Sequence, residues 1–182
     1  MIPIERWEPE FPRGPIESVY LHWSGGDYTT VFRSYHFCVA LENGRIVVAQ
    51  TNDLHANMRD VSSGGEYAAH TYRRNSFAAG IALMGMKDAS PSDFGRFPLT
   101  EELVGGLCRV AATIAGFYGI EIDAAHILTH AEAALTDGYF GSAEDERWDI
   151  ARLAPDARPL EPRDALETGD ELRRRIRELL LR

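Results

Sequence analysis

Two histidines and one aspartate have the residue types and sequence settings of metal ligands. His22 and His130 each stand at the end of an apolar, β-prone run, and Asp149 follows in the segment 146–150. Two neutral imidazoles and one carboxylate suit a divalent ion, and zinc with three protein ligands keeps one position open for water or substrate. A catalytic site needs that open position, because the ion must hold a reacting group. The three residues therefore indicate a zinc hydrolase.

A plainer interpretation competes for each histidine. A histidine at a strand end is commonly a half-buried side chain with a satisfied hydrogen bond. The chain contains no HExxH or CxxC motif, so spacing alone does not define a metal site. The interpretation therefore depends on the residues that surround each candidate.

Several short segments, taken in order, carry a family resemblance. They read Val-Tyr-Leu-His-Trp-Ser at 19–24, Ser-Tyr-His-Phe-Cys-Val at 34–39, Ala-Ala-His-Thr at 68–71, Asn-Ser-Phe-Ala-Ala-Gly-Ile-Ala-Leu-Met-Gly at 75–85, Thr-His-Ala-Glu at 129–132 and Arg-Trp-Asp at 147–149. Together they cover roughly residues 17–153 and resemble the zinc amidase family. That family includes the N-acetylmuramoyl-L-alanine amidases, phage endolysins of that class and the peptidoglycan recognition proteins.

The resemblance implies a fold and a ligand set. The fold is α/β, a single domain with a central mixed sheet flanked by helices, and zinc is bound by His22, His130 and Asp149. Asp137 lies between the last two ligands and is a rival for the third position. Asp149 is preferred because Arg-Trp-Asp matches the family's order of a basic residue and then the ligand, whereas Asp137-Gly138 is equally typical of a turn.

The same resemblance implies catalytic roles. Tyr35 falls where certain relatives place a catalytic tyrosine. Arg147 falls where many relatives have a lysine that helps to hold the oxyanion, and arginine keeps this charge with a different geometry. Glu132 is a candidate general base. It could equally orient a ligand histidine or cap a helix, and the sequence leaves these roles open.

Substrate contacts are less strongly indicated. The family match places His70 at the rim of the cleft, and Asn75 and Trp23 are further candidates. A tryptophan near a strand end is often a core residue, however. His36 directly follows Tyr35 on an expected strand, so it should point to the opposite face as a buried structural residue.

The activity implied is hydrolysis of the amide between N-acetylmuramic acid and L-alanine, with peptidoglycan or a muropeptide as substrate. Two alternatives stay open: a non-catalytic peptidoglycan-binding module of the same fold, and a zinc hydrolase acting on another amide such as a 1,6-anhydromuropeptide. Residues 1–7 lack the basic and apolar regions of a secretory signal. We therefore expect synthesis in the cytoplasm without a signal peptide, and action at the wall only after release or delivery by another system.

Composition favours an ordinary globular domain. The chain has 182 residues, 45% hydrophobic and 26% charged, which suits one domain with a full core. The formal net charge of −9 argues against nucleic acid as a partner, since phosphate contacts need clustered Lys and Arg. No apolar run approaches the roughly 18 residues that span a bilayer, so no membrane insertion is expected. We expect a monomer in which Cys38 and Cys108 are reduced core residues.

The elements that position these residues are also predicted. β-branched and aromatic enrichment predicts strands at 19–23, 35–41, 45–50 and 80–84, with a hairpin turn at Asn43-Gly44. Apolar spacing predicts a helix that begins after Thr100 and ends at Gly119. We expect a zinc amidase domain at 1–154, then a proline-rich linker and a C-terminal helix, 155–182, packed on or near it. That helix should dock with a solvated basic face, or else contact a wall or membrane.

Overall fold

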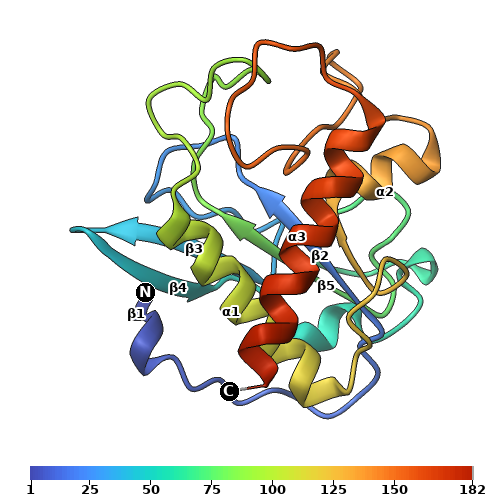
Figure 1. Ribbon diagram of the computed structural model, residues 1–182. Coiled ribbons are helices and arrows are strands. Elements are labelled where there is room, and N and C mark those ends of the chain that lie inside the picture. The colour runs from blue at the N-terminus through green and yellow to red at the C-terminus, as the bar shows by residue number, and fades with distance from the viewer. Residues whose placement is uncertain (182) are drawn as a thin grey trace.

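A six-stranded mixed sheet forms the centre of the molecule, in a computed structural model that describes residues 1–181 (Figure 1). The spatial order is β1-β4-β3-β5-β2-β6. Strands β3, β5, β2 and β6 are mutually parallel neighbours, whereas β4 pairs antiparallel with both β3 and β1. The bounds are β1 (Ile2–Pro3), β2 (Ser18–Trp23), β3 (Phe37–Glu42), β4 (Arg45–Gln50), β5 (Ala78–Leu83) and β6 (Ile127–Thr129).

The predicted strands are present: β4 has the predicted bounds, and the ends of β2, β3 and β5 differ from the prediction by one or two residues. β3 begins at Phe37, two residues later than expected, because the Tyr35 amide donates to the carbonyl of Phe32 in a turn before the strand. The hairpin between β3 and β4 lies where Asn-Gly predicted it. Asn43 and Gly44 both adopt positive φ, at 52° and 73°, as this two-residue turn requires.

Three α-helices accompany the sheet: α1 (Glu101–Tyr118), α2 (His130–Asp137) and α3 (Pro162–Leu180). The predicted ends of α1 are confirmed, since the Thr100 hydroxyl accepts a hydrogen bond from the Leu103 amide and Gly119 takes the left-handed conformation. Short 3-10 helices occupy η1 (Ile4–Arg6), η2 (Leu54–Asn57) and η3 (Val61–Ser63). No helix within residues 1–181 is long and apolar enough to cross a membrane.

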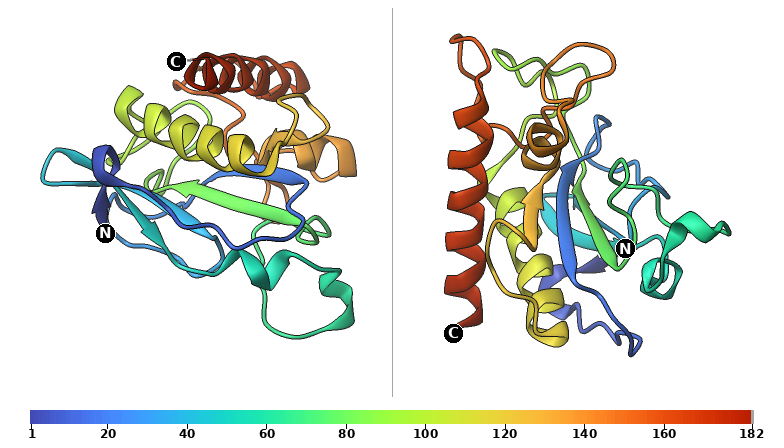
Figure 2. Two further views of the ribbon diagram at one scale, coloured as in Figure 1. Left: turned by 90° about the horizontal axis from the view of Figure 1, so that it is seen from below. Right: turned by 90° about the vertical axis from the view of Figure 1, so that its right-hand side faces the viewer.

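The two long helices lie at one face of the sheet, and the segment that carries η2 and η3 lies at the other (Figure 2). α1 packs directly on the sheet, and its buried face joins the main core with the inward side chains of β2, β3 and β5. The architecture is therefore the expected α/β domain with a mixed sheet, with both long helices on the same side. Cys38 and Cys108 are buried and unpaired, as predicted.

The C-terminal helix is part of this packing. α3 contacts α1, α2 and β6, so it docks on the domain as expected. One feature of the prediction is wrong: the basic residues do not all face solvent. Arg173 is 3% exposed, because it lies on the packed stripe of the helix beside Gly169, Leu172 and Ile176.

Candidate metal centre and cleft

The sheet brings the two predicted histidine ligands together. β2 and β6 are parallel neighbours, with Leu21 opposite Thr129, so His22 and His130 follow at the same edge. The carboxyl ends of parallel strands are where α/β folds place their ligands. His22 and His130 are 108 residues apart in the sequence, but the register of β2 and β6 brings them together, and their two Nδ1 atoms lie 3.2 Å apart.

Asp149 completes the group from the loop after α2. Its Oδ2 atom lies 3.1 Å from Nδ1 of His22 and 2.9 Å from Nδ1 of His130. The loop is held in place because the Ala131 amide donates to the Asp149 carbonyl, and because the Trp148 ring packs edge-on against Trp23 at 5.2 Å. All three ligand side chains are buried.

Electrostatics keep His22 and Asp149 in the protonation states that bind metal. Burial lowers the pKa of His22 to about 4, so its imidazole is neutral at pH 7. Burial alone would raise the pKa of Asp149, but the contacts with His130 and His22 outweigh it and hold that pKa below its usual value. A neutral imidazole and an ionised carboxylate are the protonation states that metal ligation requires.

The group fits a divalent cation. Its three donor atoms converge, and Oδ1 of Asp149 is buried without a hydrogen-bond partner among the described residues. An unpaired buried carboxylate oxygen is costly, and a cation beside it removes that cost. Asp137, the rival ligand, instead forms a two-pronged ion pair with Arg74 at 2.6 and 2.7 Å. The structure therefore assembles the preferred set, His22, His130 and Asp149.

Thr71 and His70 support His22 from behind. Nε2 of His22 lies 3.2 Å from the Thr71 hydroxyl, which in turn lies 2.9 Å from Nδ1 of His70. The Thr71 hydroxyl can accept from Nε2–H of His22, leaving the Nδ1 lone pair directed at the donor group. His70 is buried rather than at the rim, although its ring still lines the cleft.

Gly80 makes room for this arrangement. The His70 ring lies against the backbone of β5, and a β-carbon at Gly80 would stand 2.3 Å from His70 Cγ. Asn75 shapes the same loop, because its side-chain oxygen accepts from the amides of His70 and Thr71. The structure thus places Asn75 in a supporting position, with part of it lining the cleft.

His36 is buried, as expected, and has a defined tautomer. Its Nδ1 accepts from the Gly80 amide at 3.0 Å, so Nε2 carries the proton toward Oδ1 of Asn57 at 3.1 Å. Burial lowers the pKa of His36 to about 4. The histidine acts as a structural link between β3, β5 and η2.

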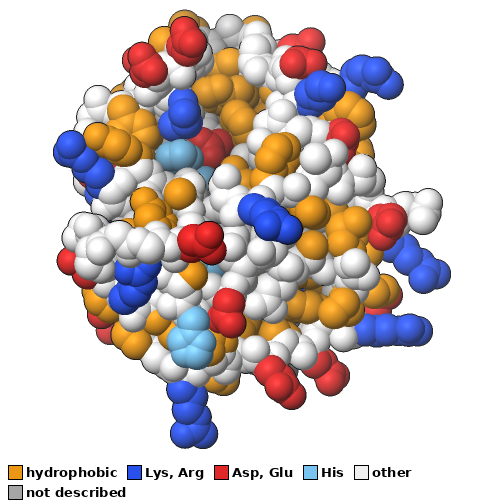
Figure 3. Space-filling model, turned by 180° about the vertical axis from the view of Figure 1, so that it is seen from behind, with side chains coloured by type: hydrophobic (Ala, Val, Ile, Leu, Met, Phe, Trp, Pro, Cys, Tyr) orange, Lys and Arg blue, Asp and Glu red, His pale blue; other side chains and the backbone are white. Residues whose placement is uncertain are grey.

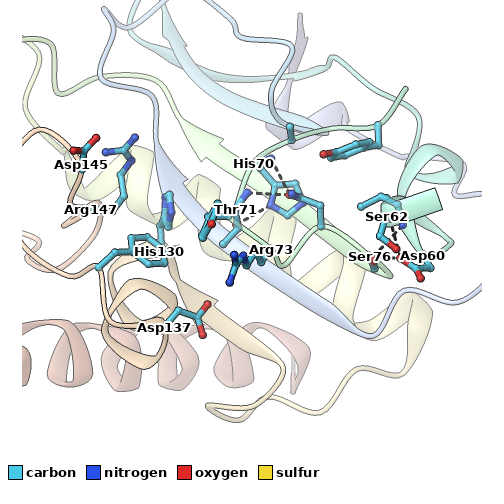
Figure 4. Close-up of a pocket in the computed structure, with 16 residues that line it drawn as sticks. Asp60, Ser62, His70, Thr71, Arg73, Ser76, His130, Asp137, Asp145 and Arg147 are labelled. Carbon is cyan, nitrogen blue, oxygen red and sulfur yellow. Dashed lines mark hydrogen bonds between the residues drawn. The ribbon is translucent and has the colours of Figure 1, made fainter. Parts of the chain in front are cut away.

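A two-part cleft opens over the metal centre. The larger part has a volume near 1070 Å³ and extends from His130 and Arg147 to Asp60, past Tyr72 and Arg73 (Figure 4). The smaller, near 360 Å³, continues on the other side. It is lined by Trp23, Tyr35, Trp148 and Asp149 among others. On the face opposite α1 and α3, Figure 3 shows a hollow with histidine and acidic side chains inside it and cationic side chains near its edge.

Tyr35 and Arg147 stand in this cleft. The ring of Tyr35 packs against His22 at 5.1 Å, and burial raises the pKa of its hydroxyl. Arg147 is exposed, and within residues 1–181 its guanidinium donates only to the backbone carbonyls of Glu144 and Glu146. Trp23, expected to contact substrate, lines the smaller part while packing on Trp148.

The expectation that Glu132 acts as a general base finds no support. Its carboxylate is buried, accepts from the Thr129 amide and forms an ion pair with Arg173. The bond to the Thr129 amide belongs to the cap of α2, the third role that the sequence left open, and the ion pair joins Glu132 to α3. The expected cleft residues are thus together, except that Glu132 faces α3.

Sequence reasoning missed Thr71, Arg173 and Tyr72 as parts of this region. Thr71 directly follows His70, but nothing local marks a hydroxyl that reaches His22, 49 residues away. Arg173 carried a signal, because it lies one turn from Gly169 and Ile176 on the packed stripe of α3. Tyr72 is exposed at the cleft and carries the Arg73 guanidinium 4.9 Å above its ring, a contact without a sequence signature.

Comparison of the sequence with protein-family models and with curated proteins found no match to either. What the fold and the site define is therefore a class: an α/β domain with a buried His-His-Asp group, able to hold a metal ion, at the base of an open cleft.

Proposed function

We propose that this protein is a zinc-dependent amidase that hydrolyses the bond between N-acetylmuramic acid and L-alanine in peptidoglycan. The observation that carries the proposal is the convergence of His22, His130 and Asp149 on one point of a cleft that is open on both sides. The order of family-like segments along the chain supplies the substrate class.

The donor spacing supports zinc. Tetrahedral zinc with ligand bonds near 2.0–2.1 Å holds its ligand atoms about 3.3 Å apart. The three donor atoms here lie 2.9, 3.1 and 3.2 Å apart, so a shift of a few tenths of an ångström, roughly, would accommodate the ion. Three nitrogen and oxygen donors with one side open match a catalytic zinc site and not a closed structural one.

The residues around the centre supply the remaining functions. A bound zinc ion contributes Lewis-acid activation of water and of the scissile carbonyl. Arg147 has no carboxylate partner within residues 1–181, so its guanidinium is free to donate charge-assisted hydrogen bonds to the oxyanion. The Tyr35 hydroxyl, whose raised pKa keeps it protonated, can donate a further hydrogen bond beside His22. The Trp23–Trp148 pair excludes water from one wall.

The cleft suits an amide that is substituted on both sides. One part extends along Tyr72 and Arg73 and the other along Trp23 and Trp148, with the metal centre between them. A sugar-linked carbonyl and a peptide could therefore occupy opposite arms while the scissile bond lies over the donor group. Exposed aromatic faces and unpaired guanidinium groups are suitable contacts for sugar rings and peptide carboxylates.

The proposal is tested by zinc content together with hydrolysis of purified peptidoglycan. We expect about one zinc per chain and chelator-sensitive release of peptides that begin with L-alanine. His22→Ala and His130→Ala should lose both properties, whereas His55→Ala, at an exposed histidine, should retain them. Wild-type protein without zinc would overturn the proposal. Bound zinc without new amino termini would redirect it to another amide.

A further inference from the structure

His130 occupies a junction that is fixed from both sides. It is the first residue of α2, directly after β6, and Thr129 is the N-cap. The Thr129 hydroxyl accepts from the Glu132 amide at 3.1 Å, and the Glu132 carboxylate accepts from the Thr129 amide at 2.9 Å. This reciprocal capping box sets the direction in which the chain leaves β6 and therefore the direction of His130.

Arg173 of α3 binds the same junction. Its guanidinium donates to both carboxylate oxygens of Glu132, at 2.8 and 3.0 Å, and to the backbone carbonyl of Ile127 in β6 at 2.8 Å. The side chains of Arg173 and Glu132 are 3% and 4% exposed. One buried cation thus holds the last strand and the capping carboxylate together, on the side opposite the donor atoms.

The approach of α3 is close at this point. A β-carbon added to Gly169 would lie 2.2 Å from the Glu132 carboxyl group, so the carboxylate fits only because position 169 has no side chain. Figure 2 shows α3 running past β6 and α2 along this side of the molecule. The contact is part of the packed interior and not a surface ion pair, whose contribution would be small.

α2 also needs an external support. It has eight residues, and an isolated helix of that length is unstable in water. Because His130 is its first residue, any loosening of the helix start moves the imidazole that closes the donor group.

We propose that Arg173 is a positioning residue for the metal site: through Glu132 and the Ile127 carbonyl, α3 fixes the orientation of His130. The inference rests on the metal-binding part of the proposed function. It assigns Glu132 to the support of a ligand, and it makes the C-terminal helix a determinant of metal affinity.

The test compares two variants that each remove a buried ion pair of α3. Arg173→Met alone would leave Glu132 unpaired and could unfold the chain. The double variant Glu132→Gln/Arg173→Met avoids this, since the Gln oxygen can still accept from the Thr129 amide. Asp164→Asn is the matched control: it breaks the buried Arg152–Asp164 pair at 2.7 Å, which ties α3 to the loop after Asp149 without touching the β6–α2 junction.

The readouts are the zinc dissociation constant, from competition with a chromogenic chelator, and the visible spectrum of the cobalt-substituted protein. For the double variant we expect affinity about 10–100-fold weaker, as for other residues that orient a ligand, with a changed cobalt spectrum. Asp164→Asn should lose stability but keep affinity and spectrum near wild type. Thermal melts of the metal-free proteins separate folding from binding.

The outcomes separate metal binding by the protein from the positioning role of Arg173. A wild-type protein that binds neither zinc nor cobalt would contradict the proposed function itself. Wild type that binds both while the folded double variant retains its affinity and spectrum would overturn the positioning role alone. Equal weakening in the double variant and in Asp164→Asn would also overturn it, since the effect would then be a general loosening of α3.

Discussion

The Thr71 hydroxyl lies between two imidazoles, 3.2 Å from Nε2 of His22 and 2.9 Å from Nδ1 of His70. Thr71 is 2% exposed, so water does not substitute for this contact. The hydroxyl therefore defines which nitrogen of His22 faces the donor group, and metal affinity should depend on it.

Thr71→Val tests this dependence at nearly constant volume. We expect zinc affinity to fall about 10-fold or more, because Nε2 of His22 loses its partner in a buried site. Thr71→Ser, which keeps the hydroxyl, should restore most of the affinity. Equilibrium titration with a competing chelator measures both. A valine variant with wild-type affinity would show that the packing of His70 alone orients His22.

Gly80→Ala should destabilise the fold. The new β-carbon would stand 2.3 Å from Cγ and 2.7 Å from Cβ of His70, so the segment that carries His70 would have to shift. Overpacking of this kind costs about 1–3 kcal/mol, measurable by urea denaturation. The matched control is Gly105→Ala, at an exposed helical position where no neighbouring atom of residues 1–181 lies within 4 Å of the new β-carbon, and there we expect a gain of roughly 0.5–1 kcal/mol. A Gly80→Ala variant with wild-type stability would mean that the loop that carries His70 can move away from β5.

Asp149→Asn and Asp137→Asn separate the two candidate ligands. Asp149→Asn removes the charge beside both histidines and should abolish stoichiometric zinc binding. Asp137→Asn breaks the ion pair with Arg74, which is partly exposed, so we expect a stability loss of about 1 kcal/mol or less and full zinc content. Elemental analysis of the purified variants decides the matter. Zinc retained in the first and lost in the second would move the third ligand to Asp137.

Much of the framework was predictable because its signals are local. The α1 helix begins at a threonine cap and ends at a glycine, and the β3–β4 hairpin turns at Asn-Gly. The position of His22 could also be predicted, since a histidine at the end of an apolar strand lies at the edge of the sheet. Each of these depends on a few neighbouring residues, which the sequence displays directly.

The parts that were missed depend on distant partners. Arg173 belongs to a basic run on the packed stripe of α3, but its buried counter-ion, Glu132, lies 41 residues away in the chain. Glu132 looked like a possible base because it lies two residues after a ligand, yet the capping box turns it toward α3. Periodicity shows which face of a helix packs, but not which charged residue finds a buried counter-ion there.

His36 predicts a pH dependence of stability. Its pKa is lowered by burial to about 4, against 6.5 for an exposed imidazole, so between these values the unfolded chain binds the extra proton. Neutral His36 therefore makes its full contribution to the free energy of unfolding above pH 6.5, and this contribution is lost as the pH falls toward 4. It amounts to about 3 kcal/mol. Protonation would also remove the Nδ1 acceptor of the Gly80 amide.

His36→Gln removes the titration while leaving a donor and an acceptor at the site. In chelator-treated protein we expect wild type to lose about 2 kcal/mol more than this variant between pH 7 and pH 5. Both proteins contain the other buried histidines, so the contributions of those residues to the pH dependence cancel in the comparison. His55→Gln, at an exposed position, should follow wild type. Urea denaturation at the two pH values provides the numbers, and parallel losses in wild type and His36→Gln would contradict the assignment of a buried neutral imidazole.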